Sequence, residues 1–405
     1  MKQHYEKVIA LCCFLFLFTN IGLPSTSFSV YQPYIIATPG VGDVGGSLVL
    51  SVRTLTSLIT VIFVDRYYHA LDVRKGVFFA CLMTAFGFLL YSFADSLALF
   101  ILGALFAGAG YGLGGMVGMT LLISRWYDHD MGGAVGFATL GSGVASMIIP
   151  VVAVQVIEGQ SLHMAFRLEA LLALSLGIVV AVLLRNRPSD IGRANSANEG
   201  NGKEAANGGG APKLATIPGV WQTLVLVAVT FVGCLCVGGG TYYSVLLTTQ
   251  GFDAHFAATT LSIIGIALTA SKFITGKMFD RFGVTRSSAI AFSVFIFGLA
   301  CSCTTPLGST ALAVASGLAI GWGAAVGTVG VSIWSLQLAD AGRSSKSVKN
   351  AQVAYSLGGF IMNAIPGPLA TLTGTYVTTY AIMLCMCIFA CVVIVSVYLR
   401  YRPGM

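Results

Sequence analysis

Long apolar stretches dominate the sequence and limit its fold more than any other feature. A helix needs about 20 mostly apolar residues to cross the hydrocarbon core of a bilayer, and we count twelve such stretches in the 405 residues. They lie at 8–30, 44–64, 76–94, 97–123, 131–155, 165–184, 219–248, 255–279, 286–304, 309–338, 347–372 and 375–399. Inside a bilayer, backbone polar groups are satisfied within each helix. The sequence therefore predicts an all-α protein that crosses a membrane many times.

The composition excludes several classes of protein. Only 9% of the residues are charged, against about 25% in soluble domains, so the chain lacks the charge for a water-facing surface. The net charge of +7 comes without a basic patch of interleaved aromatic residues, and we expect no nucleic-acid partner. We find no paired carboxylates, nucleophile–base pattern or metal-spaced histidines, so we expect no enzyme activity, no cofactor and no metal site.

The basic residues are distributed unevenly along the chain. Of the 22 lysines and arginines, all but Arg53, Arg167 and Lys272 lie near the termini or in the loops after spans 2, 4, 6, 8 and 10. Basic segments are retained on the cytoplasmic side of a membrane. We therefore expect both termini to be cytoplasmic, in a multi-pass protein of the cytoplasmic membrane of a prokaryote.

The chain has a polar centre and two similar halves. Residues 185–217, rich in Gly, Asn and Ala, predict a flexible cytoplasmic linker between an N-terminal bundle (1–184) and a C-terminal bundle (218–405). Asp65-Arg66 and Asp280-Arg281 end spans 2 and 8, and they are 215 residues apart. Pro150 and Pro366, late in spans 5 and 11, are 216 residues apart. These offsets favour two homologous six-helix bundles, related by a pseudo-two-fold axis, with a site between them.

The loop after span 8 carries a motif. Gly276-Lys-Met-Phe-Asp280-Arg281-Phe-Gly283-Val-Thr-Arg286 resembles the GxxxDRxGxxR signature of the major facilitator superfamily, and Asp65-Arg66 begins an altered first-half copy. This resemblance implies the major facilitator fold, with twelve transmembrane helices. A helix C-terminus carries partial negative charge, and we expect the acidic residues there to latch to a basic partner on the neighbouring bundle in one state only.

Two further segments are similar to one branch of that superfamily, the oxalate/formate antiporters and monocarboxylate transporters. They are Arg125-Trp126-Tyr127 with the glycine-rich stretch 132–146, and Arg187-Pro188-Ser-Asp190-Ile-Gly192. This resemblance implies secondary transport of a small organic anion by alternating access, through proton symport or anion exchange. The expected partners are a carboxylate, protons in the case of symport, and the lipid bilayer, with a monomer as the functional unit. The alternatives are a carrier of a drug, sugar or amino acid, and a membrane sensor that does not transport.

A charge within a membrane is costly and marks a functional site by default. Lys272 lies about 12 Å before Asp280 along a helix, which places it near the middle of the membrane. In the resembled branch a basic residue on span 8, usually Arg, pairs with the substrate carboxylate, and Lys272 occupies that position. The alternative is a lysine that snorkels to the interface. For Arg53 three roles stay open, namely a second anion contact, part of an outer gate, or a structural pair.

A bound carboxylate also needs hydrogen-bond donors on a mostly apolar wall. By the resemblance, spans 1, 4, 7 and 10 line the cavity, with parts of spans 2, 5, 8 and 11. The leading candidates for binding are Tyr31, Gln32, Tyr111 and Tyr355, followed by Trp322, Tyr34, Tyr242 and Tyr243. Each of these side chains is otherwise a packing residue or part of an interfacial aromatic belt.

The coupling mechanism stays open at the level of sequence. The resembled proton-coupled carriers have an acidic residue one turn before the basic residue of span 8, where this chain has Leu268. The resembled oxalate exchanger has a second basic residue on span 11, and none lies near Tyr355. The other titratable candidates are Glu169, His255 and Asp43. We interpret Arg167 and Glu169, which open span 6, as an interfacial anchor or a local ion pair.

Overall fold

The computed structural model describes residues 2–127, 131–186, 219–337 and 344–401. Within these residues every regular element is a helix, as the apolar stretches predicted. The linker expected at 185–217 lies almost wholly outside the described residues.

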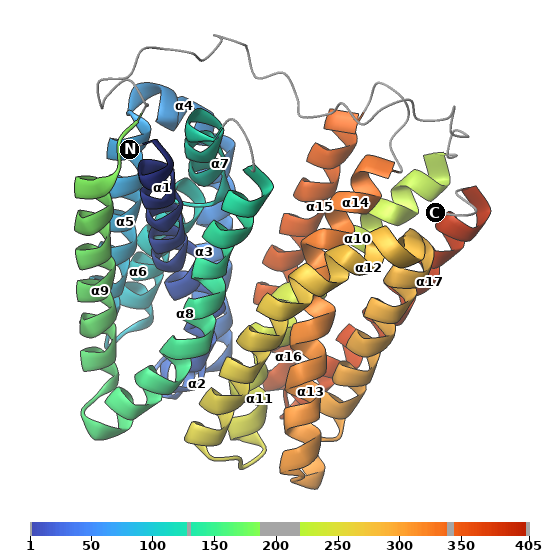
Figure 1. Cartoon of the computed structure of the whole chain (residues 1–405). Coiled ribbons are helices and arrows are strands. Elements are labelled where there is room, and N and C mark those ends of the chain that lie inside the picture. The colour runs from blue at the N-terminus through green and yellow to red at the C-terminus, as the bar shows by residue number, and fades with distance from the viewer. Residues whose placement is uncertain (1, 128–130, 187–218, 338–343, 402–405) are drawn as a thin grey trace.

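The helices from the N-terminal part of the chain pack together, and we call them the N-half (Figure 1). They are α1 (Lys2–Leu17), the π-helix η1 (Phe18–Thr26), the 3₁₀ helix η2 (Phe28–Tyr31), α2 (Gln32–Ala37), α3 (Gly42–Ile62), α4 (Val64–Ala70), α5 (Val73–Tyr91), α6 (Leu97–Leu113), α7 (Met116–Trp126), α8 (Met131–Gly159) and α9 (Leu162–Leu183).

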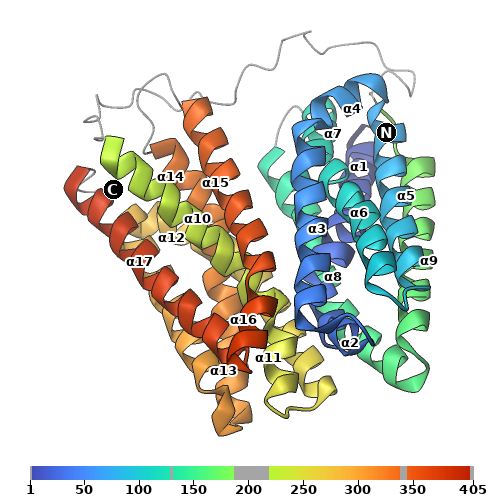
Figure 2. The same cartoon turned by 180° about the vertical axis from the view of Figure 1, so that it is seen from behind.

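The remaining helices form a second group, which we call the C-half (Figure 2). They are α10 (Gly219–Thr241), α11 (Tyr243–Thr249), α12 (Ala254–Cys303), the 3₁₀ helix η4 (Thr305–Leu307), α13 (Thr310–Gly323), the 3₁₀ helix η5 (Ala324–Gly327), α14 (Val329–Gln337), α15 (Ser344–Ala364), α16 (Pro366–Thr373) and α17 (Val377–Tyr401).

Eleven helices among the described residues are long and apolar enough to cross a membrane. The span expected at 347–372 is not one of them, and the chain forms two helices there, α15 and α16. Proline has no backbone N–H and clashes with the preceding turn, so the break falls immediately before Pro366. The first turns of α15 are also polar, with the sequence SSKSVKN.

Glycines bring α3 and α6 into close contact. A Cβ atom added at Gly108 would meet the backbone of Arg53, and one added at Gly112 would meet the backbone of Ser57. Small residues allow helices within a membrane to approach closely. The glycine-rich stretch of span 4 thereby fixes the position of the part of α3 that carries Arg53.

The helix α12 contains a sharp turn at the last glycine of the loop motif. Gly283 has φ 75° and ψ 169°, a combination that is essentially restricted to glycine. The turn lies near the junction of two segments that are long and apolar enough to cross a membrane, Ala254–Phe279 and Arg281–Cys303. The motif therefore requires glycine at this position for a conformational reason.

Replacing this glycine is expected to destabilise the protein. Gly283→Ala should lower the free energy of unfolding by about 1–3 kcal/mol, the cost of a side chain in this backbone region. Thermal unfolding of the purified protein in detergent measures the loss. Gly276→Ala is the matched control, because a Cβ atom there has no neighbour within 4 Å. Equal midpoints for the two variants would contradict the assignment.

The two halves meet at one end of the molecule and diverge toward the other (Figures 1 and 2). We call the end where Lys2 and Tyr401 lie the terminal end, and the opposite end the far end. Three contacts between the halves define what we call the far-end seal. The Tyr376 hydroxyl donates to Asp43 Oδ1 at 2.8 Å, the Gly367 N–H donates to Ser47 Oγ at 2.8 Å, and His255 Nε2 lies 2.5 Å from Glu158 Oε2.

Candidate functional site

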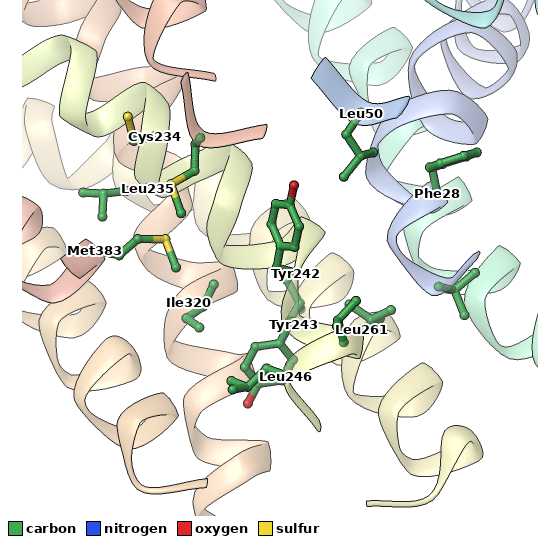
Figure 3. Packing of buried hydrophobic residues seen from close by; sticks show 14 of the residues in the cluster. Phe28, Leu50, Cys234, Leu235, Tyr242, Tyr243, Leu246, Leu261, Ile320 and Met383 are labelled. Atoms are coloured by element: carbon green, nitrogen blue, oxygen red, sulfur yellow. The ribbon is translucent and has the colours of Figure 1, made fainter. Parts of the chain in front are cut away.

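Polar side chains from both halves meet where α3 faces α15 and α16, close to Tyr242 at the junction of α10 and α11. Asn363 Nδ2 donates to Thr54 Oγ1 at 2.6 Å, across the boundary between the halves. The Tyr242 hydroxyl donates to the backbone oxygen of Asn363 at 2.8 Å and lies 3.2 Å from Ser47 Oγ. Figure 3 shows the Tyr242 and Tyr243 hydroxyls pointing in opposite directions, with Leu50 and Phe28 of the N-half across from Tyr242. Asn363 Oδ1 is buried without a hydrogen-bond partner among the described residues.

Arg53 lies beside this cluster, inside the N-half. Its side chain is 6% exposed, and its guanidinium lies 5.1 Å from the centre of the Phe28 ring. Three tyrosines are its electrostatic neighbours, namely Tyr91, Tyr111 and Tyr242. Its Nη1 atom has no hydrogen-bond partner, and no acidic residue of the described ranges pairs with it. A buried cation without a counter-charge is costly, so this environment favours an anion.

Lys272 lies on the face of α12 that is turned toward the N-half. On this face Gly265 packs against Ser146 of α8, and Thr269 lies against Gly143. Lys272 is two helical turns beyond Gly265, about 10 Å closer to the terminal end, where α8 and α12 diverge (Figure 1). Its side chain is half-buried and has no ion pair or hydrogen bond with any residue that the structure describes.

The two basic side chains lie at different depths. Arg53 is about 16 Å from the far-end start of α3, whereas Lys272 is about 27 Å from the far-end start of α12.

Tyr31 and Gln32, two of the three candidates at the end of span 1, face different surroundings. The Tyr31 hydroxyl donates to Glu169 Oε1 at 2.5 Å and is buried in the N-half, so it is not a free donor in this conformation. Gln32 is fully buried beside Gly46 of α3. Both polar atoms of its side chain lack a partner among the described residues.

The structure brings Tyr111 and Tyr355 together, although they come from opposite halves. Tyr111 is an electrostatic neighbour of both Arg53 and Tyr355. Tyr355 also hydrogen-bonds with Cys236 of α10. Trp322 lies half-buried on α13, and within the described residues its side chain makes no hydrogen bond or ring contact with this cluster.

The loop motif is described only in part. Arg66, Arg281 and Arg286 are exposed, and the guanidinium of Arg281 lies 5.6 Å from the Phe282 ring centre. The side chains of Asp65 and Asp280 lie outside the described part of the structure. The latch between the bundles therefore stays a prediction.

The interpretation of Arg167 and Glu169 as an ion pair was wrong. The exposed Arg167 lies over the ring of Phe93 at 5.5 Å, as an anchor, whereas Glu169 is 5% exposed and bonded to Tyr31. Successive helical positions differ by about 100°. Two residues separated by two positions therefore point to nearly opposite sides of α9.

Sequence reasoning missed the amide of Asn363 and its partners Thr54 and Ser47. Our search followed charged and aromatic residues, so a neutral polar side chain near the end of an apolar stretch was passed over. The available signal was an asparagine three residues before Pro366 in a span otherwise poor in polar groups at that end. A polar side chain within a membrane is itself a functional indication.

Comparison with known proteins defines the class of this molecule. The model of the major facilitator superfamily matches residues 9–349. The chain belongs to the major facilitator superfamily, and it is a multi-pass membrane transporter. No curated protein sequence matches it significantly.

Three solved structures show the same fold. A mutant of the nucleoside transporter NupG has a TM-score of 0.74 and 14% identity, covering 98% of this chain and 100% of its own. A bacterial homologue of the human lysosomal transporter Spinster, in an inward-facing and unoccupied conformation, has a TM-score of 0.67 and 14% identity, covering 99% and 97%. A POT family transporter in complex with 5-aminolevulinic acid has a TM-score of 0.74 and 12% identity, covering 98% and 96%.

Proposed function

We propose that this transporter carries a small organic anion with a carboxylate group by alternating access. The observation that supports this proposal is the pair of inward-lying cations, Arg53 in the N-half and Lys272 in the C-half, neither of which has an acidic partner among the described residues. A carboxylate supplies the missing counter-charge and accepts charge-assisted hydrogen bonds.

We assign the conformation as inward-open. The distribution of basic residues puts the terminal end in the cytoplasm, and the far-end seal then closes the outer side. The inward-facing Spinster homologue has the same fold, which is consistent with this assignment. We place the protein in the cytoplasmic membrane of a prokaryote, with both termini inside and a monomer as the working unit.

Each half contributes different groups to the proposed site. Lys272 pairs with the carboxylate as a point charge, because an ammonium lacks the bidentate geometry of a guanidinium. Tyr111 and Tyr355, which the two halves bring together, then orient the anion through their hydroxyls. Arg53 adds a positive potential to the site, whereas Gln32 and Trp322, which make no hydrogen bond or ring contact with Tyr111 or Tyr355 among the described residues, would reach the anion only in another conformation.

Counterflow in proteoliposomes tests the function directly. Vesicles preloaded separately with formate, lactate, pyruvate, oxalate or succinate should accumulate the labelled form of the carried acid, because a carrier exchanges one molecule for another at the same site. Vesicles without protein are the control. Absence of counterflow with all five acids would refute the carboxylate and direct attention to neutral or cationic solutes. Binding without flux would instead indicate a sensor.

A further inference from the structure

Glu169 is a carboxyl group enclosed within the N-half. It lies on the second turn of α9, with 5% of its surface exposed. The Tyr31 hydroxyl donates to its Oε1, and its Oε2 is buried without a hydrogen-bond partner among the described residues. The ring of Phe166, one turn earlier on α9, lies 4.5 Å from the Tyr31 ring.

No positive charge faces this carboxyl group within the described residues. From η2 it faces Tyr31, and from α5 the ring of Tyr91 packs against Phe166 at 5.3 Å. Arg53 of α3 is separated from it by aromatic rings, because the guanidinium lies over Phe28, whose ring centre is 5.8 Å from that of Tyr31.

Two other polar side chains of α9, His163 and Arg167, lie near the same end of the helix but point elsewhere. His163 contacts Asp95 at 3.4 Å and the backbone oxygen of Ser92 at 3.2 Å, while Arg167 lies over Phe93 on the surface. An ionised carboxylate held away from water and cations costs several kcal/mol. The neutral, protonated form of Glu169 is therefore the form that fits this closed arrangement.

A cavity of about 350 Å³ lies on the other side of the segment that carries Tyr31. Val30, Pro33 and Tyr34 line it from the N-half, and Ser244 and Thr248 line it from the C-half. Val30 and Tyr31 are neighbours in η2, so one residue faces the cavity while the next reaches Glu169. Since both halves line the cavity, its access to water changes when the far-end seal opens.

We propose that Glu169 and Tyr31 form a protonation site, fed with protons from this cavity, that links closure of the far end to proton uptake. A hydronium ion transfers one proton to the carboxylate and leaves as water, with no change of oxidation state. Opening of the far end lets water reach the carboxylate, and protonation allows η2 and α2 to close over it again. The inference rests on the proposed transport function. It makes the carrier a proton symporter when the proton taken up from the far end later leaves Glu169 for water at the terminal end, where hydronium forms again.

Infrared titration of the reconstituted protein tests the site without any substrate. The wild type should show the carbonyl band of a protonated carboxylic acid that disappears as the pH is raised, and Glu169→Gln should lack this band. Asp95→Asn is the matched control, because Asp95 is an exposed acid near the same end of α9, and it should keep the band. An unchanged band in Glu169→Gln would overturn the assignment.

Transport distinguishes a failure of this inference from a failure of the proposed function. Glutamine mimics the protonated side chain, so uptake driven by a proton gradient should fall by at least about tenfold, while counterflow of the same acid is retained. Loss of both activities in a correctly folded variant would overturn the coupling role. If the wild type shows no carboxylate counterflow, the proposed substrate class is wrong. The infrared titration then still tests whether Glu169 is the protonation site.

Discussion

Lys272→Gln is expected to weaken carboxylate binding by about ten- to hundredfold, because a hydrogen bond to a charged group contributes about 1.5–3 kcal/mol. Lys272 has no partner among the described residues, so its removal leaves no other protein charge unpaired. The protein should therefore fold and insert normally while its affinity falls. The half-saturation concentration in counterflow, measured with the acid that exchanges fastest, reports the loss.

Lys277→Gln is the control on the same helix. Lys277 is exposed, with its ammonium 4.3 Å from the centre of the Phe273 ring, and its loss should leave counterflow unchanged. Lys272→Arg keeps the charge and should retain most of the affinity. If Lys272→Gln behaves like Lys277→Gln, the lysine is not part of the binding site.

Gly367→Ala is expected to prevent full closure of the far end. A Cβ atom at this position would meet the backbone oxygen of Asp43 and the hydroxyl of Ser47, two residues of the far-end seal. Overpacking of this kind costs about 1–3 kcal/mol, which shifts the equilibrium between the two states by about 5- to 150-fold toward the far-end-open form. Hydrogen exchange of residues 43–50 should rise, and counterflow should fall.

Gly240→Ala provides the comparison for that experiment. Gly240 lies on α10, and a Cβ atom there has no neighbour within 4 Å. This variant should exchange hydrogen and transport like the wild type. If hydrogen exchange of residues 43–50 stays as slow in Gly367→Ala as in Gly240→Ala, the close approach of α16 to α3 does not control closure.

The apolar stretches predicted most of the fold, since each one alone satisfies the length and composition of a membrane helix. Prediction was least accurate at residues 347–372. There, hydrophobicity indicated one span, whereas Pro366 divides the segment into α15 and α16. The proline was visible in the sequence, but whether it bends a helix or ends it depends on its neighbours.

The candidate site was predicted unevenly, for a physical reason. Lys272 and Arg53 stand out in the sequence because charge is rare within apolar stretches. Asn363 does not stand out in this way, and its contact with Thr54 joins residues from opposite halves, 309 positions apart. The buried face of α9, which includes Ala165, Phe166, Ala170 and Ala173, has the helical spacing that places Glu169 inward. Helical periodicity alone was therefore enough to predict that Glu169 is buried and that Arg167 is exposed.

The chemistry of the far-end seal has a thermodynamic consequence. Its contacts are hydrogen bonds and one solvent-accessible contact between a histidine and a glutamate, which individually contribute only about 1 kcal/mol or less. Opening the far end also separates apolar residues of the two halves, which belong to one buried cluster, and exposed apolar surface raises heat capacity. The balance between open and closed forms is therefore expected to curve with temperature, so that the closed form is favoured most at an intermediate temperature and less in the cold and in the heat.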